Sequence, residues 1–141
     1  MEIGGLSRVE FAFPGPLRDQ LVAAILSGAK TSTSGLVVEY ERENEPLPKV
    51  GQQLAVVDSE DRPVAVIELT ELRVLPLAAV DLRHALDEGE GYQSVAEWRA
   101  GHESFWHSAE MRAELGDPGF TVNDDTLVLA QRFRLVRAVR G

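Results

Sequence analysis

"VAVIELTELRVL", residues 64–75, is a long β-rich run in this chain. The alternation of apolar and polar side chains that is typical of a strand changes phase within it, near Thr70-Glu71. A β-bulge or a tight bend produces such a phase change, and either one helps a sheet to curl. The run therefore predicts a curved sheet.

The segments around this run predict further strands. A strand is expected before the Pro14-Gly15-Pro16 break, and apolar or alternating residues predict three more, over residues 37–40, 53–58 and 126–139. Residues 13–28 predict a turn followed by a helix, and helical spacing predicts further helices over residues 78–88 and 94–115. Gly28 is a natural end for the first helix, and Ser94-x-x-Glu97 is a capping-box pattern at the start of the third.

These elements together predict an α+β fold: a curved, barrel-like sheet with helices packed around it. At 141 residues, the chain fits one domain, residues 1–141, that can bury a core without disulfides. No apolar stretch approaches the roughly 18 residues that span a bilayer, and no segment has a signal-peptide layout. We therefore expect a cytoplasmic protein without a membrane partner.

Composition excludes several kinds of site. The chain has no cysteine, so disulfides, thiolate metal sites and cysteine nucleophiles are impossible. Its formal net charge of −9 disfavours broad electrostatic binding to long DNA or RNA. A basic patch near the C-terminus could still engage a nucleotide or a short strand; as a strand face it could equally be solvated. Its arginines are Arg132, Arg134, Arg137 and Arg140.

Residues 28–35, "GAKTSTSG", follow the first predicted helix and concentrate hydroxyl groups around one lysine. In a tight turn, positions three apart lie within about 7 Å, as Lys30 and Thr33 would. A partly desolvated lysine can take a hydroxyl proton and so activate a threonine nucleophile. The alternative is a structural one, because Ser and Thr favour turns in which their hydroxyls satisfy free backbone groups.

A second unusual stretch, residues 87–91, "DEGEG", crowds three acids at a predicted helix C-terminus, where the helix dipole disfavours them. Crowding and the dipole would raise a carboxyl pKa, and a nearby lysine would lower it. We expect no metal site here, because the loop lacks the ligand alternation of an EF-hand and His102 and His107 are five residues apart. His102, on an apolar helix face, is interpreted as a core histidine.

Two motifs in this order resemble a known family. "LVAAILSGAKTSTSGL" resembles the Gly-x-Lys-x-x-Thr signature of the ASCH family, named for homology to a transcription coactivator. "HALDEGEGYQSVAEWRAGHESFW" resembles a segment of its small bacterial, EGEG-containing branch. With "PLPKVGQQLAVVD" and "LVLAQRFRLV", the resemblance covers roughly residues 10 to 137. It implies a PUA-like β-barrel of about five to six strands that binds RNA or a nucleoside beside the signature turn.

One branch of the family hydrolyses N4-acetylcytidine, and the resemblance implies the same catalytic roles here for Lys30, Thr33 and Glu88. Lys30 would deprotonate Thr33, and Glu88 would orient Lys30 or protonate the leaving amine; whether Glu88 or Glu90 is the functional acid stays open. The expected substrate-binding residues are Gly28, Thr31, Ser32, Arg18, Glu90, Tyr92 and Trp98, with Tyr92 or Trp98 offering a stacking surface and Arg18 or the last arginines a phosphate contact.

That amidohydrolase branch is shorter and lacks the EGEG run, so the substrate need not be acetylcytidine. The expected partner is a nucleoside, a nucleotide or a short RNA, with no DNA and no cofactor. Two alternatives to the hydrolase remain open, a non-catalytic RNA-binding module and a metal-free ribonuclease. The sequence does not indicate an oligomeric state.

Overall fold

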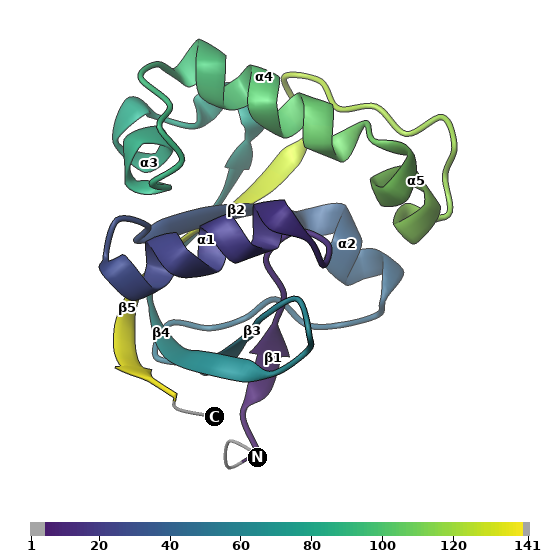
Figure 1. Ribbon diagram of the computed structural model, residues 1–141. Helices are drawn as coiled ribbons and strands as arrows, with labels where there is room; N and C mark the ends of the chain where they lie inside the picture. The colour runs from purple at the N-terminus through teal and green to yellow at the C-terminus, as the bar shows by residue number, and fades with distance from the viewer. Residues whose placement is uncertain (1–4, 140–141) are drawn as a thin grey trace.

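The computed structural model describes residues 5–139, which form one five-stranded sheet with helices around it (Figure 1). The strands are β1 (Ser7–Val9), β2 (Ser32–Leu36), β3 (Gln53–Val57), β4 (Pro63–Pro76) and β5 (Leu127–Ala138). Their order in the sheet is β1-β3-β4-β5-β2. Only the β1–β3 pair is parallel; the other neighbours are antiparallel.

The bulge predicted in β4 is confirmed. Its register against β5 shifts between Leu69 and Glu71, and again between Val66 and Ile67. Each irregularity increases the local twist, which bends this 14-residue strand. The predicted α+β, PUA-like fold is also confirmed, although the sheet is open, with β1 and β2 as its edges.

The helices occupy two levels of the molecule. They are α1 (Pro16–Ser27), α2 (Val37–Arg42), the 3₁₀ helix η1 (Leu77–Ala79), α3 (Leu82–Asp87), α4 (Val95–Trp106) and α5 (Ala109–Leu115). Figure 1 shows α3, α4 and α5 at one end of the molecule, β1 and β3 at the other, and α1 between them. No helix within residues 5–139 is long and apolar enough to cross a membrane.

Two hydrophobic clusters correspond to these levels. In the first, Leu21 and Ile25 of α1 pack with Val56, Ile67 and Phe133 of the sheet. The second lies under α4 and contains the two tryptophans and a strand residue from β2: Trp98, Trp106 and Leu36. Burying large aromatic side chains is a major source of stability, so Trp98 and Trp106 hold α4 in place.

Both predicted helix-end signals are confirmed. Helix α1 ends at Gly28, whose φ of 86° is the left-handed conformation that glycine adopts without steric cost. At the start of α4, the backbone N–H of Glu97 donates to Ser94 Oγ at 3.1 Å, and the Glu97 carboxylate accepts from the N–H of Gln93 at 2.8 Å.

The prediction of a strand over residues 37–40 is wrong. Those residues form helix α2, and the strand is β2, inside the hydroxyl-rich stretch that was expected to be a turn. Strand β2 exists because it pairs with β5 along its whole length, from Ser32 opposite Arg132 to Leu36 opposite Val128. This pairing overrides the weak intrinsic strand preference of Ser and Gly.

Two predicted helices are each interrupted. The helix expected over residues 94–115 breaks at His107, and Ser108 starts α5 by accepting a hydrogen bond from the N–H of Met111 at 3.1 Å. The helix expected over residues 78–88 divides into η1 and α3, and Asp81 caps α3 through the N–H of His84. In each case, a capping side chain satisfies one of the free N–H groups at the start of the new helix.

Candidate functional site

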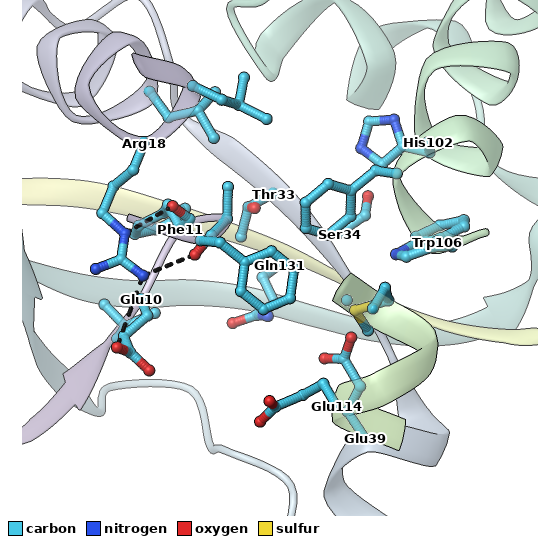
Figure 2. A pocket seen from close by; sticks show the side chains of 18 of the residues that line it. Glu10, Phe11, Arg18, Thr33, Ser34, Glu39, His102, Trp106, Glu114 and Gln131 are labelled. Carbon is cyan, nitrogen blue, oxygen red and sulfur yellow. Dashed lines mark hydrogen bonds and ion pairs between the residues drawn. The ribbon is translucent and has the colours of Figure 1, made fainter. Parts of the chain in front are cut away.

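A cavity of about 580 Å³ lies between the sheet and helices α4 and α5 (Figure 2). Residues from β1, α1, β2, α2, the loop after α3, α4 and α5 line it. Its volume falls within the roughly 300–1,000 Å³ of small-molecule sites. Figure 2 shows Thr33 and Ser34 together on β2, with His102 and Trp106 on α4.

Two loops meet at the closed end of this cavity. The backbone N–H of Thr31, after α1, donates to the carbonyl of Asp87 at the end of α3 at 2.8 Å. Gly89 has a φ of 71°, and a Cβ there would lie 2.5 Å from the carbonyl oxygen of Ala29. Only glycine permits this approach, which places the "DEGEG" loop against the Lys30 backbone.

Lys30 is buried where these loops meet, with its side chain 1% exposed. Its Nζ donates to the carbonyl of Ser32 at 2.9 Å and to the carbonyl of Glu88 at 3.3 Å. The carboxylates of Glu88 and Glu90 lie 3.9 Å and 3.7 Å from the same Nζ. All these neighbours accept hydrogen bonds, an environment that suits an ammonium group.

The carboxylate of Glu88 is held by donors from four side chains. Its Oε2 accepts from Ser34 Oγ at 2.7 Å and from Trp98 Nε1 at 2.8 Å. His102 Nε2 lies 3.0 Å from Oε1, and His84 Nε2 lies 3.2 Å from Oε2. The residue itself is 1% exposed. Glu88 is therefore a buried anion with every oxygen occupied.

Burial alone would raise the pKa of Glu88, because desolvation disfavours the charged form. Hydrogen bonds from His102 and His84, with the charge of Lys30, outweigh burial and hold the pKa well below 4.5. The charge of Lys30 acts in the direction expected from the sequence, but the hydrogen bonds from the two histidines lower the pKa of Glu88 more.

His102 completes the ion-pair cluster. Its Nδ1 lies 2.9 Å from the carbonyl of Trp98 and its Nε2 faces the Glu88 carboxylate, so both ring nitrogens have acceptors and the ring suits the imidazolium form. Burial would lower the pKa of His102, but the hydrogen bond and charge of Glu88 raise it. The ring stacks on Trp98 with centroids 4.4 Å apart.

Glu90 differs from Glu88 although it lies only two residues away. Its side chain is 16% exposed and lines the cavity, and it pairs with Lys30. Burial and the neighbouring Glu88 raise the pKa of Glu90, and Lys30 opposes this only in part. Beside it, burial and these two glutamates raise the pKa of Tyr92 to about 12.

Acidic side chains crowd the other end of the cavity, which Arg42 of α2 also lines. Glu39 of α2 faces Glu114 of α5, as Figure 2 shows, and Glu43 is also near. Burial first, and then the charges of Glu43 and Glu114, raise the pKa of Glu39 to about 7. Within residues 5–139, no ion pair joins Glu39 to a lysine or arginine.

Six of the predicted site residues line the cavity: Lys30, Thr33, Glu88, Glu90, Tyr92 and Arg18. Arg18 is nevertheless bound internally. Its Nε donates to the carbonyl of Phe11 at 3.2 Å, its Nη1 to that of Asp58 at 3.2 Å and its Nη2 to that of Ala12 at 2.8 Å. The expectation that Arg18 holds a phosphate therefore does not fit, because its guanidinium is 2% exposed and already bonded.

The other predicted substrate-binding residues, Gly28, Thr31, Ser32 and Trp98, are not among the lining residues. Trp98 is fully buried and donates to Glu88, so it has no free face on which to stack a base. Ser32 is also fully buried, with its hydroxyl donating to the carbonyl of His84 at 2.9 Å.

The basic patch expected at the C-terminus is largely paired. Arg132 binds the carboxylate of Asp87 at 2.5 Å, and Arg134 lies 3.3 Å from that of Glu68. Arg137 is exposed, and Arg140 lies outside the described residues. Neither Arg132 nor Arg134 lines the cavity.

Sequence reasoning missed several polar residues of the site, namely Ser34, His84, His102 and Glu39. His102 has satisfied hydrogen bonds, as expected of a core histidine, but it also lines the cavity. One local signal existed: His102 follows Trp98 by one helical turn, so both face the same neighbour. The acidic character of the Glu39 end had no such signal, because α2 and α5 meet only in the folded chain.

Glu88, Glu90 and His102 each have an atom of a type that binds metal ions, and these atoms lie within 4.8 Å of one another. Lys30 Nζ lies against both carboxylates and compensates their charge. A divalent cation would have to displace that ammonium, so we assign no metal to these residues.

Comparisons with known proteins agree with this architecture. A crystal structure of a protein from Enterococcus faecalis V583 superposes with a TM-score of 0.82 at 25% identity, over 98% of this chain and 80% of that one. An ASCH domain from Lactobacillus crispatus JV V101 gives a TM-score of 0.78 at 27% identity, over 93% and 79%. An ASCH structure from Zymomonas mobilis, 12% identical with a TM-score of 0.51 over 86% and 68%, shares the fold alone.

No curated protein matches the chain. The family model described as "ASCH domain" matches residues 9–137. The family is PUA-like and generally associated with RNA. This match spans the signature lysine, the "DEGEG" loop and all but the outermost residues of the sheet, and the chain belongs to the ASCH domain family.

Proposed function

We propose that the cavity binds a modified nucleoside and that the protein hydrolyses an amide on its base, as in N4-acetylcytidine. One observation carries this proposal: Lys30 and Thr33 of the signature line the same cavity as Glu88 and Glu90. A hydroxyl nucleophile, an amine and carboxyl groups are the components of acyl transfer through a covalent intermediate.

The aromatic residues on the cavity wall support a planar ligand. Phe13 and Phe105 line it with ring centroids 5.7 Å apart, and Tyr92 lies on another part of the wall. Aromatic rings stack on bases, and polar groups at the base edge then set its orientation. Gln131, paired with Thr33 across β2 and β5, is one such polar group on the wall.

Charge supports a nucleoside over a long RNA. Besides Glu88 and Glu90, the lining residues include Glu10, Glu39, Glu43, Glu45 and Glu114. Burial first, and then the charges of Glu43 and Glu114, raise the pKa of Glu39 to about 7. Phosphate groups would be repelled there because these glutamates outnumber the lining arginines Arg18 and Arg42, and Arg18 is already bonded to carbonyls. The partner is therefore a small nucleoside in the cytoplasm, or the end of a short RNA.

In this reaction, Lys30 takes the proton of Thr33 and the threonine oxygen attacks the acyl carbon. The C–N bond breaks, the amine leaves with a proton, and water then hydrolyses the acyl-threonine. No hydrogen bond joins Lys30 to Thr33 within residues 5–139, so the two must come together when the ligand binds. Catalytic hydrogen bonds are often longer in ligand-free enzymes and tighten in the complex.

The test is to incubate the protein with N4-acetylcytidine and with single-stranded RNA, and to follow deacetylation and strand cleavage side by side. We expect deacetylation that is lost in Lys30→Ala and in Thr33→Ala. RNA cleavage without deacetylation would indicate a ribonuclease instead. Binding of RNA that weakens in Lys30→Ala, with neither reaction, would indicate a non-catalytic binding module.

A further inference from the structure

The two glutamates of the "DEGEG" loop have different environments. The Glu88 oxygens already accept from Ser34, Trp98 and His102, and the side chain is 1% exposed. A proton on Glu88 would break at least one of these charge-assisted bonds inside a buried cluster. Glu88 is therefore poorly placed to exchange protons with a ligand.

Glu90 has the opposite arrangement. Its side chain lines the cavity and is 16% exposed, so one side of the carboxyl group faces the ligand space. The charged and titratable groups that face it are Lys30, Glu88, His102 and Tyr92. Only Lys30 forms an ion pair with it within the described residues, at 3.7 Å. A proton can thus pass between Lys30 and Glu90 while Glu88 keeps its bonds from Ser34, Trp98 and His102.

We infer that Glu90 is the catalytic acid that protonates the departing amine, and that Glu88 is a positioning residue that holds Lys30 and His102. This inference rests on the proposed amidohydrolase function. It places Glu90 in the reaction and takes Glu88 out of proton transfer.

The proton balance closes within the Lys30–Glu90 pair. The reactive form has a neutral amine on Lys30 and a protonated Glu90, which differs from the ion pair by one proton transfer. In acylation, Lys30 gains the Thr33 proton, the new O–C bond forms, the C–N bond breaks, and Glu90 gives its proton to the nitrogen. In deacylation, water gives a proton to Glu90 and its hydroxyl to the acyl carbon, while Lys30 returns a proton to Thr33.

The burial of Glu90 fits this role. Desolvation and the charge of Glu88 raise its pKa, which favours the protonated carboxyl that the acid step requires. Because the acid must carry a proton, amide hydrolysis should decline as pH rises through the raised pKa of Glu90.

The experiment compares two substrates whose leaving groups differ. N4-acetylcytidine must have its nitrogen protonated as it leaves, whereas 4-nitrophenyl acetate releases a stable anion that needs no proton. We expect Glu90→Gln to lower kcat for acetylcytidine by at least about 100-fold and to leave its KM within about 3-fold. With the ester, the first burst of 4-nitrophenolate reports acylation alone and should fall by no more than about 3-fold, while the later steady-state turnover slows because deacylation also uses Glu90. Thr33→Ala should lose both activities.

The matched control is Glu60→Gln, which removes an exposed carboxylate outside the cavity and should keep both activities. Glu88→Gln should lose both, because Lys30 loses its anchor. Wild-type amide hydrolysis in Glu90→Gln, or an equal loss of amide hydrolysis and of the ester burst, would overturn the assignment while leaving the proposed function intact. A wild-type protein that does not deacetylate acetylcytidine would overturn the proposed function, and the Glu90 assignment with it.

Discussion

The pKa of a glutamate side chain shifts in opposite directions at the two ends of the cavity. At the closed end, Glu88 is nearly inaccessible and ionised, because Lys30 and His102 surround it with donors and positive charge. At the other end, burial first, and then the charges of Glu43 and Glu114, raise the pKa of Glu39 to about 7. Burial acts in the same direction on both carboxyl groups, and only at Glu88 do donors and cations outweigh it.

This difference has a functional meaning. The closed end is a fixed, pre-organised ion cluster, which is what a catalytic or binding site needs to hold a ligand in one orientation. The acidic end is electrostatically strained and selects against anionic groups. Together they favour a small uncharged ligand over a polyphosphate.

The largest effect on the free energy of unfolding is expected from removing the Glu88 carboxylate at the closed end of the cavity. Glu88→Gln leaves Lys30 and His102 without their anion, and breaking a buried ion pair in this way costs about 3–5 kcal/mol. Urea denaturation at pH 7 should show this loss in the free energy of unfolding. Glu90→Gln, two residues on, should change it by less than about 1 kcal/mol, because burial already disfavours its charge.

The pH dependence of the Glu88 effect follows from the sign of its pKa shift. The folded-state pKa lies below the unfolded value of 4.5, so the stabilisation is present above pH 4.5 and is lost as pH falls below it. The difference between wild type and Glu88→Gln should therefore narrow in acid. A difference under about 1 kcal/mol at pH 7 would contradict the ion-cluster interpretation.

A gain of stability is expected at the acidic end. Glu39→Gln removes a carboxylate whose folded-state pKa, about 7, lies above the unfolded 4.5. Wild-type stability from this group is highest below pH 4.5 and declines as pH rises to about 7. At pH 8, the variant should be more stable by up to about 3 kcal/mol, and at pH 4 the two should be nearly equal.

Denaturation curves at pH 4, 6 and 8 measure this effect. Glu41→Gln, on the same helix and exposed, is the matched control and should show no such pH dependence. Equal stability of wild type and Glu39→Gln at pH 8 would mean that the crowding of Glu39, Glu43 and Glu114 is relieved in solution.

The smallest effect is expected from removing one donor at the closed end. Ser34→Ala deletes the hydroxyl that donates to Glu88 and contacts His84 Nε2, which should cost about 1–2 kcal/mol. Thr33→Ala is the neighbouring control: its hydroxyl has no hydrogen bond within the described residues, so the cost should be under about 0.5 kcal/mol. Equal costs for the two variants would show that the Glu88 cluster does not depend on Ser34.

Local patterns predicted much of the fold. The end of α1 at Gly28, the cap at Ser94 and the bulge at Leu69–Glu71 depend on neighbours within a few residues, and all three are confirmed. The sequence did not predict that residues 32–36 form strand β2 and that residues 37–42 form helix α2. Val37 and Val38 have strand propensity, but the backbone of residues 32–36 is the one that reaches β5.

The candidate site was likewise predicted only in part from the sequence. The resemblance brought Lys30, Thr33 and Glu88 together as one prediction, and the structure places them on one cavity while their roles stay a prediction. Ser34 could not have been predicted, because it joins the Glu88 cluster only if residues 32–36 form a strand.

The sequence alone determined the features that depend on composition and on neighbouring residues. These are an acidic, cysteine-free α+β chain, a lysine motif and an acidic loop. The tertiary structure alone decided which of these charges are compensated. Glu88 and Glu90 have the same side chain and nearly the same place in the chain, yet the pKa of one falls and that of the other rises. Electrostatic energy depends on distance in space and on exposure to water, and both arise from contacts between residues far apart in the sequence.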